Sequence, residues 1–270
     1  MRVAALSDIH GNLPALEAVL AEVARLGADV VVNLGDIVSG PLWPRETAQR
    51  LMALDLPTIA GNHERQLLTT PRERQSASDA HAAAALGESE RGWLRGLPAA
   101  CRPADDVACC HGTPASDLHY LLETVTAGFG IEGSRGVRAA SLDEVTARCA
   151  GVDAGLLLCG HSHVPRALRL AGGMLVVNPG SVGLQAYDDD QPAEHWVEIG
   201  SPHARWALIE RPRPGADWNV ALMATAYDWE AAARQAERNA RGDWADALRT
   251  GRVGRTGREA RATQAGAAPA

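Results

Sequence analysis

Short aliphatic runs alternate with helix-like patterns over the first sixty residues. The runs cover residues 3–6, 30–34 and 58–60, which are lengths typical of strands. Between the first two, six apolar positions from 13 to 26 follow helical spacing, and a second helix is expected at 45–54. Asn12 suits the N-cap of the first helix, and Gly27 suits its end. This order predicts a βαβαβ unit and a parallel sheet with right-handed crossovers.

The pattern changes after a mostly helical stretch at 63–97. Loop and helix are expected at 116–149, and short strands at 107–110, 155–159, 167–170, 175–177, 196–199 and 205–209. Late strands separated by turn signals suggest a second, more antiparallel sheet. Helices are expected at 229–239 and 244–248. We therefore expect one domain over residues 1–250, with a core at 1–210, a helical extension at 211–250 and a disordered tail at 251–270.

Polar residues suited to metal binding follow five of the expected strands. In chain order the clusters are Asp8-Ile9-His10, Gly35-Asp36, Gly61-Asn62-His63, Cys110-His111-Gly112 and Gly160-His161-Ser162-His163. Open α/β sheets place their sites beyond the carboxyl ends of the strands. Residues two apart in extended chain point the same way, so Asp8 and His10 can face one cavity, and so can His161 and His163. The pattern predicts one site built from five strand ends.

The donor atoms in these clusters are carboxylate, imidazole and amide, without an obligatory thiolate. This mixture suits Mn²⁺, Fe or Zn²⁺, with Mn²⁺ favoured, better than it suits a cysteine-rich structural zinc site. Besides His63, the clusters hold two aspartates, one asparagine and four histidines, which exceeds the needs of one ion. Two divalent ions about 3.5–4 Å apart fit the count. Asp36 stands alone after its strand and is the natural bridging carboxylate.

The five clusters, in this order, resemble the calcineurin-like metallophosphoesterase superfamily. The short early spacing, together with Asn178-Pro179-Gly180-Ser181-Val182-Gly183, resembles its small bacterial and archaeal phosphodiesterase branch. The resemblance covers the expected core at 1–210. It implies a four-layer α/β/β/α sandwich with two mixed sheets, which agrees with the strand pattern.

The resemblance also implies a role for each clustered residue. Asp8, His10, Asp36 and His163 would hold the first metal ion, and Asp36, Asn62, His111 and His161 would hold the second. His63 would face the phosphate and either protonate the leaving oxygen or stabilise charge in the transition state. The implied activity is that of a binuclear metal-dependent phosphoesterase, in which a metal-bridged hydroxide attacks a small phosphodiester or nucleotide.

Three other functions stay open at this point. Two are enzymatic, namely hydrolysis of dinucleoside polyphosphates and dephosphorylation of proteins. The third is a binding scaffold with the same fold and no catalysis. The complete ligand set and His63 argue against the scaffold, because a degenerate site would be expected to have lost some of them.

Charge composition narrows the choice of substrate contacts. The chain has 33 acidic and 26 basic residues, a net charge of −7, and every basic residue is arginine. The absence of lysine excludes Schiff-base and P-loop chemistry, and the acidic balance argues against a nucleic-acid binder. A side-chain cation that grips phosphate must therefore be arginine or protonated histidine. Arg166, Arg205 and His119 are the candidate substrate-binding residues.

Cysteine usage and the apolar runs bear on location and partners. Five cysteines at irregular spacing do not make a disulfide framework. The chain shows no apolar run of a signal peptide and none near the ~18 residues of a membrane span. We expect a cytoplasmic protein that acts on a small phosphorylated substrate, without nucleic-acid or membrane partners. Its oligomeric state is open.

Overall fold

The computed structural model describes residues 1–254. Its helices are α1 (Leu13–Leu26), α2 (Pro44–Leu54), α3 (Asn62–Thr69), α4 (Ala77–Ala85), α5 (Glu88–Arg95), α6 (Leu142–Arg148), α7 (Trp229–Arg238) and α8 (Gly242–Thr250), with 3₁₀ turns η1 (Arg72–Arg74) and η2 (Ile131–Gly133). Its strands are β1 (Arg2–Leu6), β2 (Val30–Asn33), β3 (Ala100–Ala104), β4 (Val107–Cys110), β5 (Glu123–Val125), β6 (Val137–Ala139), β7 (Leu156–Leu158), β8 (Arg166–Arg169), β9 (Leu175–Asn178), β10 (Ala186–Asp189), β11 (His195–Glu198), β12 (Ala204–Glu210) and β13 (Asn219–Thr225).

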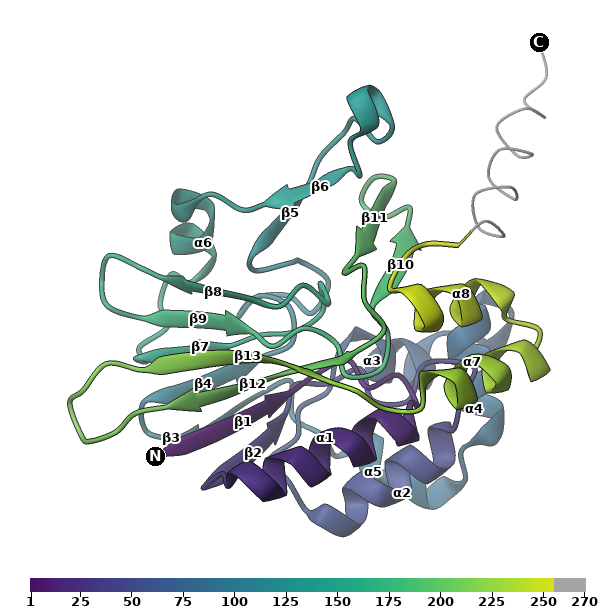
Figure 1. Cartoon of the computed structure of the whole chain (residues 1–270), viewed down its shortest axis with the longest axis horizontal. Helices are drawn as coiled ribbons and strands as arrows, with labels where there is room; N and C mark the ends of the chain where they lie inside the picture. Colours follow the sequence, from purple (N-terminus) through teal and green to yellow (C-terminus); the bar gives the residue numbers. More distant parts are fainter. Residues whose placement is uncertain (255–270) are drawn as a thin grey trace.

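Two mixed sheets form the centre of the molecule (Figure 1). The first has the order β13-β12-β1-β2, with β1 and β2 parallel and the other pairs antiparallel. The second has the order β3-β4-β7-β9-β8, with β4, β7 and β9 parallel and an antiparallel strand at each edge. The hairpins β5-β6 and β10-β11 stand outside both sheets, above the end where the parallel strands finish.

Three apolar layers hold the sheets and helices together. Between the sheets, Val3 of β1 packs in the same cluster as Leu158 of β7. Leu6, on the opposite face of β1, packs with Val19 of α1, and Val145 of α6 lies in the cluster on the outer face of the second sheet. The order helix, sheet, sheet, helix confirms the predicted α/β/β/α sandwich with two mixed sheets.

The first helix follows its sequence signals. Asn12 caps it, because its Oδ1 accepts the backbone N–H of Ala15 at 3.2 Å, and Gly27 ends it with a φ of 78°. The Nδ2 of Asn12 also donates to the Gly183 carbonyl at 2.9 Å. The cap therefore ties the helix to the 178–183 turn as well as starting it.

Some elements differ from the sequence predictions. The expected strand at 58–60 is reduced to a single parallel bridge between Asn33 and Thr58. The expected helical extension at 211–250 begins with β13, an antiparallel edge strand beside β12. The Ala, Leu and Met residues of β13 are good helix formers, and pairing along seven positions of β12 overrides that preference.

The C-terminal end of the described chain is packed. Val253 is 7 % exposed, and its N–H donates to Glu198 Oε1 at 2.8 Å, so residues 251–254 do not belong to the expected disordered tail. The remainder of that prediction, 255–270, lies outside the described residues. None of the helices within residues 1–254 combines the length and the apolarity needed to cross a membrane. All five cysteines are free, as their spacing predicts.

Candidate metal centre

Five loops at one end of the two sheets carry the candidate ligands. Asp8 and His10 follow β1, Asp36 follows β2, Asn62 begins α3, His111 follows β4, and His161 and His163 follow β7. Six of the seven side chains are at most 5 % exposed, and His161 is half-buried. The structure thus brings all seven residues to one place from strands of both sheets.

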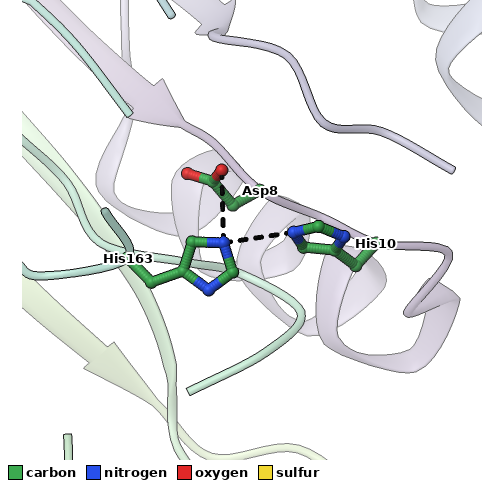
Figure 2. A group of neighbouring side chains, drawn as sticks. All are labelled: Asp8, His10 and His163. Carbon is green, nitrogen blue, oxygen red and sulfur yellow. Dashed lines mark hydrogen bonds and ion pairs between the residues drawn. The ribbon is translucent and has the colours of Figure 1, made fainter. Parts of the chain in front are cut away.

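Three of these residues form a compact group on the side of the first sheet (Figure 2). His163 Nε2 lies 3.4 Å from Asp8 Oδ1 and 3.1 Å from His10 Nε2. The donor atoms of the three side chains all lie within 4.8 Å of one another. One carboxylate and two imidazoles at this spacing can hold a divalent ion.

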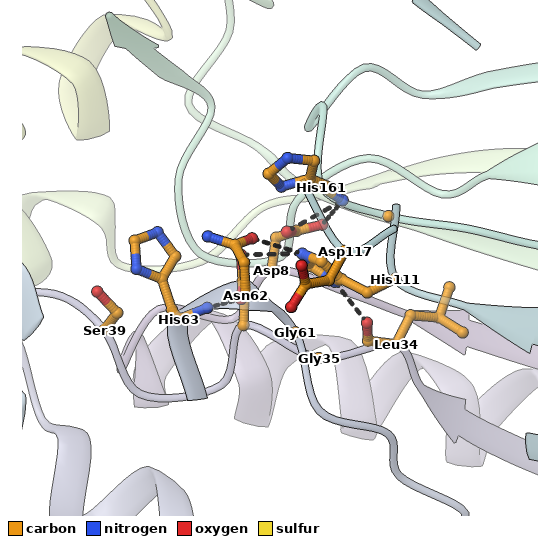
Figure 3. Close-up of polar contacts among 12 residues, drawn as sticks. Asp8, Leu34, Gly35, Ser39, Gly61, Asn62, His63, His111, Asp117 and His161 are labelled. Carbon is orange, nitrogen blue, oxygen red and sulfur yellow. Dashed lines mark hydrogen bonds and ion pairs between the residues drawn. The ribbon is translucent and has the colours of Figure 1, made fainter. Parts of the chain in front are cut away.

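A second group lies beside the first (Figure 3). His111 Nε2 is 3.1 Å from Asp36 Oδ2 and 3.1 Å from Asn62 Oδ1, and His161 completes the group. The backbone N–H of His161 donates to both carboxylate oxygens of Asp8, at 3.3 and 3.1 Å, which joins the second group to the first.

Hydrogen bonds to the backbone determine which ring nitrogen each histidine directs into the centre. Nδ1 of His10, His111 and His163 lies 2.7 Å from the carbonyls of Ser39, Leu34 and Leu184. A carbonyl only accepts, so each Nδ1 carries a proton and each Nε2 faces inward. Outer hydrogen bonds of this kind orient metal-binding histidines.

The charges in the centre suit a cation. Burial lowers the pKa of His10 to about 4 and that of His161 to about 3, so both are neutral imidazoles at neutral pH. The Nε2 atoms of His10 and His163 face each other at 3.1 Å, an arrangement that a positive ion between them would stabilise. Burial also disfavours the charge on Asp36, but His111 and His63 outweigh it and hold the pKa of Asp36 well below its usual range. The residues present fit a metal.

Five of the seven candidate ligands have a left-handed backbone. The φ angle is 54° at Asp8, 52° at His10, 53° at Asp36, 68° at His161 and 58° at His163. Residues other than glycine rarely adopt this conformation, which costs about 1–2 kcal/mol each. Such strain collects at functional sites, where the surrounding structure imposes it.

Glu64 connects two of the ligand loops. Its buried carboxylate accepts the backbone N–H groups of Asp36, Ile37 and Gly61 at 2.8, 2.8 and 2.9 Å. Gly61 has to be glycine here, because a Cβ would lie 2.2 Å from Asp36 Oδ1. The Gly-Asn-His-Glu sequence therefore fixes Asp36 as well as presenting Asn62.

His63 lies at the edge of the centre and is paired with a residue that the sequence analysis did not identify. Its Nδ1 lies 2.9 Å from Asp79 Oδ1, while Asp79 Oδ2 accepts the Ser76 hydroxyl at 2.8 Å. Burial alone would lower the pKa of His63, but Asp36 and Asp79 raise it to about 9. The sequence does not mark Asp79 as a site residue, because Ser-x-x-Asp at the start of a helix is an ordinary capping sequence. Ser76 does cap α4.

A cavity of about 1480 Å³ opens over the centre. His63, His119 and Tyr120 line it, as do Tyr187 and Trp244, which the sequence does not mark as site residues. Tyr187 and Trp244 carry no motif that would have marked them.

Arg166 and Arg205, two of the expected substrate contacts, are not among the residues that line this cavity. The Arg166 guanidinium donates to the carbonyls of Leu122 and Ala140, and Arg205 lies on β12. Of the three candidates, only His119 lines the cavity.

Sequence comparison relates the chain to one family. The model of the calcineurin-like phosphoesterase superfamily domain matches residues 1–196. An uncharacterised protein of Methanocaldococcus jannaschii is 39% identical over 62 residues, a stretch equal to 23% of this chain and 26% of that protein. The match therefore spans about a quarter of the curated relative's length.

Structure comparison agrees on the fold. A metallophosphoesterase of Sphaerobacter thermophilus matches with a TM-score of 0.64 and 23% identity, over 92% of this chain and 99% of its own. A hypothetical protein of Pyrococcus horikoshii matches with a TM-score of 0.72 and 19% identity, over 93% and 98%. At these identities the likeness is one of fold.

Proposed function

The chain belongs to the calcineurin-like phosphoesterase superfamily, and from that premise we propose that it is a binuclear metal-dependent hydrolase of small phosphate esters. The observation that carries the proposal is the paired arrangement of donors in the centre. Two groups, each with one carboxylate and two imidazoles, lie side by side and are joined by the Asp8–His161 hydrogen bonds. That arrangement suits two ions better than one.

The ligands divide between two metal positions. Asp8, His10 and His163 would hold one ion, and Asn62, His111 and His161 the other, with Asp36 shared. Asp36 Oδ1 already accepts the backbone N–H of His63 at 3.0 Å, while Oδ2 faces His111. Divalent ions bound here would supply charge neutralisation for the phosphate and lower the pKa of a water toward ~7. We favour Mn²⁺, with Fe and Zn²⁺ as alternatives.

The protein's own contribution to bond cleavage centres on His63. Asp79 accepts from Nδ1, so Nε2 remains to donate a proton to the leaving oxygen. The pKa of His63, raised to about 9 in the metal-free protein, and the hydrogen bond with Asp79 favour a protonated ring, as a general acid requires. The Asp36 carboxylate holds the backbone of His63, so the acid and the metal ligands keep a fixed relation.

The substrate we propose is a phosphodiester or nucleotide. The cavity exceeds the ~300–1,000 Å³ of ordinary small-molecule sites, so a dinucleoside polyphosphate is the second candidate. The net charge of −7 favours a small phosphorylated molecule over nucleic acid or a membrane surface. Five free cysteines fit the reducing conditions of the cytoplasm, where we propose that the protein acts.

Metal reconstitution combined with hydrolysis assays tests this function. Metal-free protein loaded with Mn²⁺, Fe²⁺ or Zn²⁺ is expected to bind two ions per chain and to hydrolyse bis-p-nitrophenyl phosphate. Nucleotides, cyclic nucleotides, dinucleoside polyphosphates and phosphopeptides then rank the substrates. Asp36→Asn should reduce both metal content and turnover. Absence of bound metal and of turnover would leave the binding scaffold as the better explanation.

A further inference from the structure

Two tyrosines pack against the two halves of the candidate metal centre. The ring of Tyr120 lies on His161 with centroids 4.9 Å apart, and the ring of Tyr187 lies on His163 with centroids 4.7 Å apart. His161 belongs to the second donor group and His163 to the first. Each group thus has one tyrosine against one of its imidazoles.

The two tyrosine hydroxyls are bonded to each other. Their oxygens are 2.6 Å apart, and the Tyr120 hydroxyl also lies 2.8 Å from His195 Nε2. The three residues come from separate places in the chain, since Tyr120 follows β4 while Tyr187 and His195 lie on β10 and β11. The contact therefore joins the β10-β11 hairpin to the second sheet across the centre.

The direction of these hydrogen bonds follows from His195, the last of the three hydrogen-bonded residues. His195 is fully buried, and its Nδ1 lies 2.8 Å from the Ala193 carbonyl, so Nδ1 carries a proton. In the tautomer with the proton on Nδ1, Nε2 accepts from Tyr120. Because the Tyr120 hydrogen points to His195, the 2.6 Å contact between the two hydroxyls uses the Tyr187 hydrogen, and Tyr187 donates to Tyr120. The second acceptor near Tyr187, the Ser162 carbonyl, is more distant at 3.4 Å.

His161 and His163 are the two imidazoles that the tyrosine rings contact. Both follow β7 in a loop and have left-handed backbones. A ring held through one nitrogen can still pivot about that hydrogen bond, and a second ring packed against it restricts the pivot. Ligand geometry must be held within about 10–20° for a site to work.

We propose that Tyr120 and Tyr187 are positioning residues that couple the two metal positions through their shared hydrogen bond. The inference rests on the proposed function, because it takes His161 and His163 as ligands. Removal of either hydroxyl would free both rings, so one substitution would weaken metal binding in both halves. Outer residues that orient metal ligands typically account for 10–100-fold in affinity.

The phenylalanine variants provide the test, and the third tyrosine of the chain provides a matched control. Tyr120→Phe and Tyr187→Phe keep the rings and lose the bond. Tyr227→Phe also loses a hydroxyl hydrogen bond, the partly buried one with Asn12, and leaves the bond between Tyr120 and Tyr187 intact. Calorimetric titration of metal-free protein with Mn²⁺ gives the affinities, and the Mn²⁺ electron paramagnetic resonance spectrum reports whether the two ions are coupled. Thermal unfolding of the metal-free proteins measures stability separately.

We expect both site variants to bind Mn²⁺ about tenfold more weakly and to show a changed spectrum, with KM for bis-p-nitrophenyl phosphate unaltered at saturating metal. Tyr227→Phe should lose stability only. Unchanged affinity and spectrum in both site variants would overturn the proposal, and so would a raised KM with intact metal binding, which would make the tyrosines substrate contacts. A wild-type protein that binds none of Mn²⁺, Fe²⁺ and Zn²⁺ would instead refute the proposed function. If a phenylalanine variant fails to fold, His195→Leu removes the terminal acceptor and is judged by the same readouts.

Discussion

Asp79 and His63 form a pair whose partners lie sixteen residues apart in the chain, with Asp79 Oδ1 at 2.9 Å from His63 Nδ1. Burial would raise the pKa of Asp79, but the hydrogen bond from His63 outweighs it and holds that pKa below its usual range. The pair therefore consists of a carboxylate and a protonated ring. Its geometry leaves Nε2 of His63 for chemistry.

Asp79→Asn keeps a hydrogen-bond acceptor and removes the charge. We expect kcat to fall by about tenfold, with KM and metal content unchanged, because His63 becomes a less well-placed proton donor. Steady-state kinetics and metal analysis measure both effects. In a His63→Ala background the same substitution should add no further loss, and an additive loss would show that Asp79 acts independently.

His63→Ala removes the proposed general acid itself. Turnover should fall by about 10²–10⁴, because general acid catalysis contributes on that scale. Metal content should remain at the wild-type value, since both nitrogens of His63 lie outside the two donor groups. Unaltered turnover in this variant would remove His63 from the mechanism.

Removal of metal should destabilise the fold. The metal-free centre holds two carboxylates and four imidazoles without the ions that their arrangement suits. A ligand that binds the folded state at 100 times its Kd adds about 2.7 kcal/mol per site. Urea unfolding with a chelator, compared with unfolding in excess Mn²⁺, measures the difference. Equal midpoints would mean that no ion binds the folded chain specifically.

Glu123 predicts a pH dependence of stability that is separate from the metals. Burial raises the pKa of this 4 % exposed carboxyl to about 7, while Ser162 donates to it. The folded pKa lies above the unfolded one, so the stabilisation is complete below pH ~4.5 and is lost as the pH rises through 7. The total is on the order of 3 kcal/mol.

Glu123→Gln abolishes this titration. Between pH 4.5 and 8 the variant should gain stability relative to the wild type by up to the same amount. Urea unfolding of both proteins in chelator, at several pH values, measures the gap. A gap that does not change with pH would show that Glu123 titrates normally.

Arg166 should act on stability and not on substrate affinity. Its guanidinium satisfies the buried carbonyls of Leu122 and Ala140, and a buried acceptor left unpaired costs about 1–3 kcal/mol. Arg166→Ala should therefore lower the free energy of unfolding by a few kcal/mol and leave KM near the wild-type value. A raised KM with unchanged stability would restore the role in substrate binding expected from the sequence.

The sequence predicts the layers of the fold and the candidate ligands of the metal centre, because both depend on local sequence patterns. Strand ends such as Asp8-Ile9-His10 are visible as residues, and parallel topology brings them together. Contacts that depend on the path of the chain are not visible in this way. Asp79 reaches His63 from a separate helix, and Tyr187 reaches His163 from a hairpin.

Side-chain direction is the second limit. Arg166 follows His163 by three residues, yet in β8 its guanidinium is directed to the carbonyls of Leu122 and Ala140. The strand β13 was not predicted, because its partner strand β12 decides its conformation. The glycines beside the ligands were visible in the sequence, whereas the left-handed backbone of the ligands themselves was not.

Because of that left-handed backbone, a substitution that increases folding stability at these positions weakens metal binding. Glycine adopts the same φ angles without strain, so replacing Asp8, His161 or His163 by glycine relieves about 1–2 kcal/mol at each position in the metal-free protein. Each such substitution gains stability but removes a metal ligand. If variants of this chain were selected for heat resistance alone, without a requirement for turnover, substitutions would therefore accumulate at the metal ligands. The positions that lose their ligands in such a library would identify the metal centre.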